Sequence, residues 1–168
     1  GDPKLPDQGN PQCLCVDRSG RLWVGTNGKG VYLYNRENDK FTQYLGDNSG
    51  ETLFGENIYK MCDYGDELVI GIHEGKLRKL NKRKNILTDV NAPEVHYKII
   101  RDVACFDDEL WVGTQSGVYV INELKNKISH IYNDPMCSYS LSDNQIGRIY
   151  RDRENGIWIC LLYTSDAA

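Results

Sequence analysis

Leu22-Trp23-Val24-Gly25-Thr26 is the stretch that decides the fold, because its pattern recurs along the chain. The other copies are Leu68-Val69-Ile70-Gly71-Ile72, Leu110-Trp111-Val112-Gly113-Thr114 and Ile157-Trp158-Ile159. The central residues, at positions 23, 69, 111 and 158, are separated by 46, 42 and 47 positions. That period is typical of propeller blades. Each copy is apolar at successive positions, which indicates a strand buried on both faces and makes the Trp a packing residue. The Gly after the triplet is expected to leave room for a neighbour's Trp or backbone.

The surrounding sequence repeats in the same order. A short apolar strand and an acidic turn precede each triplet, and a Gly-bearing turn, an alternating strand and a weaker fourth strand follow it. Four strands joined by hairpins describe a blade. We therefore predict an all-β fold, a β-propeller fragment of about 3.5 four-stranded blades in an incomplete ring. Residues 1–11 form a preceding link, and residues 12–159 form the partial propeller, with blades near 12–45, 58–90, 99–132 and 145–159, the last truncated.

Residues 160–168 depart from the repeat, which continues with Gly-Thr in its first and third copies. The segment Cys160 to Ala168 resembles the translation of a sequencing-library adapter, so we expect it to be a non-native tail. Open blade faces lack the neighbours that stabilise repeat units. The fragment alone is therefore expected to be marginally stable or prone to aggregation.

Composition excludes some classes of function. The net charge of −4 over 168 residues gives no electrostatic footprint for nucleic acid. No apolar run approaches the roughly 20 residues of a membrane helix. The six cysteines show no CxxC spacing. Cys13 and Cys15 share one face of a strand, where burial as small apolar residues is expected and a metal or redox pair is the alternative.

Motifs for catalysis are weak, and we predict no catalytic, cofactor-binding or metal-binding residue. The segment Gly25 to Gly30 superficially resembles a phosphate loop, but a strand pattern follows it, so it is predicted to be a hairpin turn. Asp107-Asp108-Glu109 is expected to be a solvated turn. The solitary histidines are expected to lie at the surface or to have satisfied hydrogen bonds: His73, His96 and His130. A basic run is expected to form a solvated outer edge or, alternatively, an anion-binding patch: Lys76, Arg78, Lys79, Lys82, Arg83 and Lys84.

Blade topology indicates where a ligand would bind. The turns between second and third strands, and the links between blades, emerge at one end of the strands. Loops are where binding residues concentrate, and these are long and polar. We therefore predict ligand-binding residues on them, although the alternative is that they only connect blades. The predicted residues are Asn27, His73, Gln115, Tyr139 and Asn144.

Two stretches carry a family resemblance. Ser140-Leu141-Ser142-Asp143-Asn144-Gln145-Ile146, followed by Asp152 to Gly156 and Ile157-Trp158-Ile159, resembles the two-component regulator propeller repeat. The stretch from Asp17 to Thr26 is similar to the same motif. The resemblance extends over about residues 12–159 and is specific in the first, third and fourth units. The second unit departs from it, with Val69 for Trp and Ile72 for Thr.

The resemblance implies a role in signalling. Propellers of this family form the periplasmic or extracytoplasmic sensors of bacterial hybrid two-component systems and often sense oligosaccharides. It implies that this segment is not an enzyme, needs no cofactor, binds no nucleic acid and passes the signal to downstream domains. The parent protein would be a membrane-anchored, dimeric histidine kinase. Two alternatives are a propeller enzyme, such as a polysaccharide lyase or hydrolase, and a protein-interaction scaffold.

Overall fold

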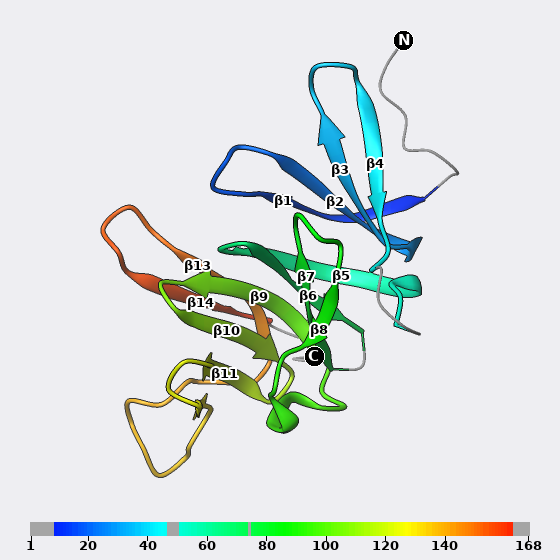
Figure 1. Ribbon diagram of the computed structural model, residues 1–168. Helices are drawn as coiled ribbons and strands as arrows, with labels where there is room; N and C mark the ends of the chain where they lie inside the picture. Colours follow the sequence, from blue (N-terminus) through cyan, green and yellow to red (C-terminus); the bar gives the residue numbers. More distant parts are fainter. Residues whose placement is uncertain (1–8, 47–50, 74, 163–168) are drawn as a thin grey trace, which may run out of the picture. The chain divides into compact units, whose positions relative to one another are not determined.

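The computed structural model describes residues 9–46, 51–73 and 75–162. The chain divides into two compact units, residues 1–90 and residues 91–168. Antiparallel strands joined by hairpins make up nearly all the regular structure of each unit (Figure 1). The chain is therefore all-β, as predicted.

The first unit contains eight strands in its described part. They are β1 (Asn10–Val16), β2 (Leu22–Lys29), β3 (Val31–Asn35), β4 (Lys40–Tyr44), β5 (Phe54–Tyr64), β6 (Glu67–Ile72), β7 (Lys76–Asn81) and β8 (Leu87–Asp89). Consecutive strands pair antiparallel within two groups, β1–β4 and β5–β8. A short pairing that sets Asn27 opposite Asn57 joins β2 to β5. Each group has the hairpin order that a propeller blade requires.

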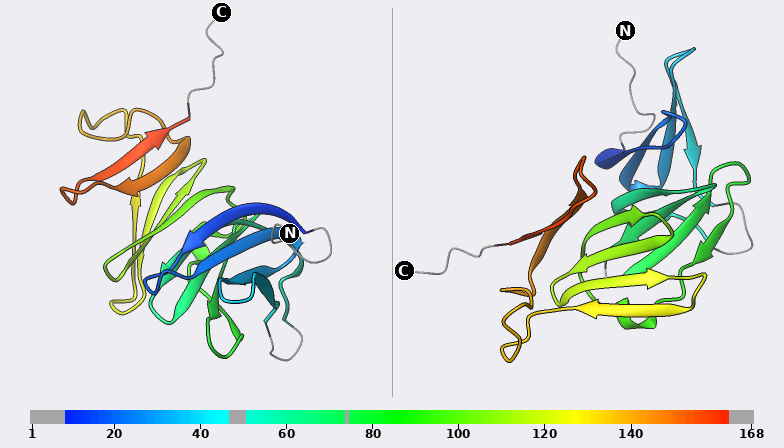
Figure 2. Two further views of the ribbon diagram at one scale, coloured as in Figure 1. Left: turned by 90° about the horizontal axis from the view of Figure 1, so that it is seen from above. Right: turned by 90° about the vertical axis from the view of Figure 1, so that its left-hand side faces the viewer.

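The second unit contains a four-stranded sheet and a separate hairpin in its described part. The strands are β9 (Ile100–Phe106), β10 (Glu109–Thr114), β11 (Gly117–Asn122), β12 (Lys127–Ile131), β13 (Ile146–Arg151) and β14 (Ile157–Leu161). A 3-10 helix, η2 (Pro93–Val95), precedes β9. Figure 2 shows the orange-red β13–β14 hairpin beside the β9–β12 sheet. No helix among the described residues is long and apolar enough to cross a bilayer.

The apolar triplets form the centre of the first unit's core. Trp23, Leu68 and Ile70 have no exposed surface. They belong to a cluster drawn from both strand groups: Cys15, Trp23, Val31, Leu53, Ile58, Met61, Leu68, Ile70, Ile72, Leu80 and Leu87. Burial on both faces explains why the triplet is continuously apolar rather than alternating. The packing role predicted for Trp23 is confirmed.

The second unit has its own core between the sheet and the hairpin. Val118 and Val120 of β11 cluster with Ile146 and Ile149 of β13. Around them pack Ala104, Phe106, Trp111, Ile131, Leu141, Ile159 and Leu161. The third and fourth repeats are thus held together by apolar side chains.

Gly25 and Gly113 hold equivalent places in the repeat and permit the same close contact. A methyl group on Gly25 would lie 2.6 Å from Cγ2 of Ile58 and 2.6 Å from Sγ of Cys13. A methyl group on Gly113 would lie 2.6 Å from Cγ2 of Ile146. Both isoleucines are on the first strand of the following repeat. The group that needs the space is therefore an isoleucine side chain, not a Trp or the backbone.

The fourth repeat differs from the first. Trp158 is 55% exposed, whereas Trp23 is fully buried. Among the described residues β14 pairs with β13 alone, and the Trp158 ring stacks on Tyr150 with centroids 6.4 Å apart. Trp158 is therefore not enclosed as Trp23 is.

The first residues of the predicted tail continue β14. Cys160 pairs with Arg148, and Leu161 pairs with Ile146. Residues 163–168 lie outside the described residues. The non-native origin of the tail stays a prediction, and so do the blade boundaries.

Candidate functional site

The carboxylate of Asp17 organises the turn between β1 and β2. It accepts hydrogen bonds from the backbone N–H groups of Ser19 (2.9 Å) and Arg21 (3.0 Å). It also accepts from Arg21 Nε (2.8 Å) and Trp23 Nε1 (2.9 Å). Burial alone would raise the pKa of Asp17, but the bonds from Trp23 and Arg21 outweigh burial and hold the pKa below its usual range. Asp17 is therefore a fixed, ionised group that ties the turn to the triplet strand.

The hydrogen bond from a Trp indole to an Asp carboxylate recurs in the fourth repeat, where Asp152 also stands six residues before Trp158. Asp152 accepts a 2.5 Å hydrogen bond from Trp158 Nε1, and this bond lowers the pKa of Asp152. In the third repeat Cys105 occupies the place of the Asp, and Trp111 Nε1 is buried without a hydrogen-bond partner among the described residues. This pairing was not predicted, although the shared six-residue spacing was visible in the sequence.

Lys82 is a buried cation that replaces the indole in the second repeat. Asp63 stands six residues before Val69, which occupies the Trp position. The ammonium group of Lys82 donates to Asp63 and, at 2.6 Å, to the carbonyl of Gly65. It also lies 3.9 Å from Oδ2 of Asp17. With 5% of Lys82 exposed, these partners satisfy a charge that burial would otherwise make costly.

The prediction of a solvated outer edge is wrong for part of the basic run. Arg78 and Lys82 are 8% and 5% exposed. The guanidinium of Arg78 contacts Glu51 and, at 3.0 Å, Asp89. Both cations are buried because carboxylates brought from other segments of the first unit neutralise them.

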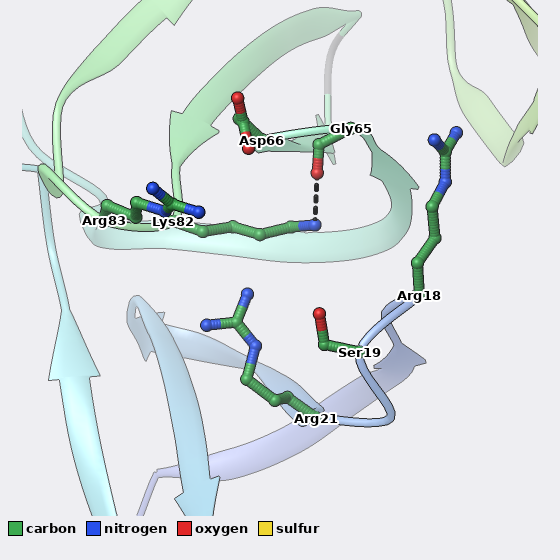
Figure 3. Close-up of a pocket in the computed structure, with 7 residues that line it drawn as sticks. All are labelled: Arg18, Ser19, Arg21, Gly65, Asp66, Lys82 and Arg83. Atoms are coloured by element: carbon green, nitrogen blue, oxygen red, sulfur yellow. Dashed lines mark hydrogen bonds between the residues drawn. The ribbon is translucent and has the colours of Figure 1, made fainter.

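A pocket of about 220 Å³ opens at the same turns. It is lined by Arg18, Ser19, Arg21, Gly65, Asp66, Lys82 and Arg83. Figure 3 shows Arg21 and Ser19 on one side of the pocket and Lys82 and Gly65 on the other. These residues come from the β1–β2, β5–β6 and β7–β8 turns, which lie at one end of the antiparallel strands. Lys82 and Arg83 belong to the basic run for which an anion-binding patch was the alternative prediction, but the sequence did not predict that Arg18, Ser19 and Arg21 join them.

The ligand-binding residues predicted in the first unit lie at the opposite ends of its strands. Asn27 is near the end of β2, and His73 is in the β6–β7 turn. Both are exposed. They are therefore separate from the basic pocket.

In the second unit, two of the predicted residues lie at the same end of the sheet. Gln115 Oε1 accepts a hydrogen bond from the backbone N–H of Ile99 at 2.8 Å. Asn144 Oδ1 accepts from the backbone N–H of Asn133 at 2.6 Å, and the Asn144 carbonyl accepts from Gly117 N–H at 2.9 Å. The side-chain oxygens of Gln115 and Asn144 thus hold the loops in place. Their ligand-binding role, like that of Tyr139, which is 98% exposed, stays a prediction.

An aromatic stack that was not predicted lies at this same end. His130 stacks on Tyr119 with centroids 4.2 Å apart, and Tyr132 stacks on His130 at 4.8 Å. The ammonium group of Lys98 lies 5.7 Å from the Tyr119 ring centroid. The sequence carried a signal, since His130 and Tyr132 are two apart at the end of β12 and β12 pairs with the strand of Tyr119. Tyr132 remains 47% exposed and available to a ligand.

Cys13 and Cys15 both pack in the first unit's core, as predicted from their spacing. The Cys13 thiol donates to the Ile58 carbonyl at 3.5 Å. Burial raises the pKa of each thiol to about 11. Over residues 9–46, 51–73 and 75–162 no group of three His, Cys, Asp or Glu side chains is arranged to hold a metal ion.

The strand order and the recurring triplets define the chain as a β-propeller fragment. Residues 4–28 and 140–162 match the family described as the two component regulator propeller. The matches fall on the first and the fourth units. The second and third units lie outside the two matches. The second has Val69 at the Trp position, and the third has Cys105 where the matched units have Asp.

Several solved structures share this fold. The extracellular domain of BT4673 from B. thetaiotaomicron, assigned to the hybrid two component systems, aligns with a TM-score of 0.72 and 24% identity over 92% of this chain and 20% of its own. The extracellular domain of BT3049 from the same organism, with the same assignment, aligns with a TM-score of 0.64 and 22% identity over 96% of this chain and 21% of its own. YCF48 bound to D1 peptide aligns with a TM-score of 0.65 and 13% identity over 90% of this chain and 48% of its own.

These likenesses establish the fold. The chain spans about a fifth of the length of the first two structures. No curated protein matches the sequence.

Proposed function

We propose that this chain is part of the extracytoplasmic sensor propeller of a hybrid two-component system, where it binds an oligosaccharide and passes the signal to downstream domains. The segment itself is non-catalytic, and its parent is a membrane-anchored, dimeric histidine kinase. The observation that carries the proposal is the regulator propeller repeat at residues 4–28 and 140–162. The two similar extracellular domains from hybrid two component systems support it.

The aromatic stack supports a sugar as the ligand. Aromatic side chains offer a broad apolar face and, in tyrosine, a polar tip, which suits a ring that is apolar on one face and carries hydroxyls at its edge. The exposed ring of Tyr132 lies next to polar groups on the neighbouring loops, among them Asn133 and Asn144. Aromatic walls with a few fixed polar groups are the usual lining of a small-ligand site.

The test is binding of an oligosaccharide library to the complete propeller of the parent protein. The proposal expects a subset of glycans to bind and Tyr132→Ala to weaken that binding about tenfold. Leu124→Ala is the matched control, because Leu124 is 82% exposed in the β11–β12 turn, at the other end of the same strands. Cleavage of glycosidic bonds would indicate an enzyme instead. Binding of peptides but no glycan would indicate a scaffold, and either result overturns the proposal.

A further inference from the structure

Several hydrogen-bond donors that line the basic pocket of the first unit have no acceptor among the described residues. Among the described residues the Arg83 guanidinium has no hydrogen-bond or ion-pair partner, and the Ser19 hydroxyl has none either. Arg21 donates a hydrogen bond only through its Nε, to Asp17, and its guanidinium lies 5.5 Å from the Trp23 ring centroid. A guanidinium carries five N–H donors, so Arg21 and Arg83 retain most of theirs for a ligand.

Two of the acidic groups near the pocket are already engaged with the residues that line it. The fully buried carboxylate of Asp17 already accepts four hydrogen bonds. Asp63 accepts from Lys82 and, at 2.9 Å, from the backbone N–H of Arg18. Only Asp66 lines the opening with an unengaged carboxylate among the described residues. The carboxylates of Asp17, Asp63 and Asp66 carry three negative charges. The pocket is lined by four cationic side chains, so a net charge of one positive unit remains: Arg18, Arg21, Lys82 and Arg83.

The size of the pocket limits the ligand. Its volume of about 220 Å³ is below the roughly 300 to 1,000 Å³ typical of sites for drug-sized molecules. It therefore has room for one ring or one charged group rather than for a chain. The planar guanidinium fork matches the paired oxygens of carboxylates and similar oxyanions.

We propose that this pocket binds the carboxylate or sulfate group of a small acidic ligand such as a sugar acid. Arg83 and Arg21 supply the N–H donors, Ser19 supplies a hydroxyl, and the buried Lys82 contributes positive charge from beneath. Asp66 at the opening opposes the ligand and limits the affinity. The site lies at the opposite ends of the strands from Asn27 and His73, so the inference does not rest on the oligosaccharide proposal.

The test is calorimetric titration of the full chain at constant ionic strength with glucuronate, inorganic sulfate and glucose. Binding of glucuronate assigns a carboxylate, binding of sulfate assigns a sulfate group, and glucose is expected not to bind. Arg83→Ala should weaken the binding about tenfold or more, since it removes a charge-assisted contact. Asp66→Asn should strengthen it severalfold, and added salt should weaken it.

Lys84→Ala is the matched control, because Lys84 is an exposed cation in the same turn that does not line the pocket. It removes the same charge from the protein as Arg83→Ala and should leave the affinity unchanged. Equal losses for Arg83→Ala and Lys84→Ala would reduce the effect to net charge and overturn the site. Absence of binding by both anions, or equal binding of glucose, would also overturn it.

Discussion

Trp23 Nε1 donates a 2.9 Å hydrogen bond to Asp17 Oδ2, and both side chains are buried. The bond connects the turn after β1 to the strand that carries the first triplet. A hydrogen bond to an ionised group is stronger than one between neutral groups. The Asp-to-Trp pair is therefore an energetic element of the repeat as well as a sequence signature.

Replacing the charge at this position should destabilise the protein in a pH-dependent way. At pH 7, Asp17→Asn is expected to lower the free energy of unfolding by about 3 kcal/mol, because Arg21 and Lys82 lose the negative charge that they face. The folded-state pKa of Asp17 lies below that of an aspartate in an unfolded chain. Its contribution is therefore complete above pH 4 and is lost as the pH falls through the folded pKa. Urea denaturation should show that the difference in unfolding free energy between the variant and the unsubstituted chain is constant near neutral pH and shrinks as the pH falls below about 4. A difference that stays constant down to about pH 3 would contradict this.

The buried Trp23 and the partly buried Trp111 should respond differently to removal of the indole N–H. Trp23→Phe removes one of the four hydrogen bonds to the ionised Asp17 carboxylate, whereas Trp111→Phe removes an N–H that has no partner among the described residues. The Trp23 variant should therefore lose about 1 to 2 kcal/mol more of unfolding free energy than the Trp111 variant. Both variants lose similar volume, so each serves as the other's control. A larger loss for Trp111→Phe would refute the assignment.

The fold was predictable from the sequence, and the basic pocket was not. Trp23, Gly25 and their repeats make contacts set by blade geometry, so their spacing in the sequence carries the information. The burial of Lys82 depends on Asp17 and Asp63, which lie 65 and 19 positions away. Without the fold, nothing distinguishes this lysine from its solvated neighbours. The acidic turns looked alike in the sequence, although only those of the first and fourth repeats accept a hydrogen bond from a Trp indole among the described residues.

A methyl group at Gly25 should disrupt the packing between the first two repeats. Gly25→Ala places a carbon 2.6 Å from Ile58 Cγ2 and Cys13 Sγ, so a loss of about 1 to 3 kcal/mol is expected. Ile58→Ala removes one of the clashing groups. A double-mutant cycle should therefore show that the second substitution costs less when Gly25→Ala is present. Strict additivity of the two free energies of unfolding would contradict the contact.

The described free cysteines should separate into two reactivity classes. Cys13 and Cys15 have a pKa of about 11 because of burial, so at pH 8 they are almost wholly protonated and unreactive. Cys137 and Cys160 are exposed. Iodoacetamide labelling followed by peptide mass spectrometry should modify Cys137 and Cys160 first and reach the other two only after denaturation. Prompt labelling of Cys15 in the native protein would contradict its place in the core.

The central claim is that this propeller segment belongs to a two-component sensor. The most direct measurement is the sequence of the natural transcript, read across codon 160 and onward. The account predicts further propeller repeats, then one membrane-spanning helix and a histidine kinase domain. A transcript that continues into the present residues 160–168 would contradict the non-native tail. A transcript that encodes a polysaccharide-cleaving domain, or that ends without a kinase, would contradict the sensor assignment.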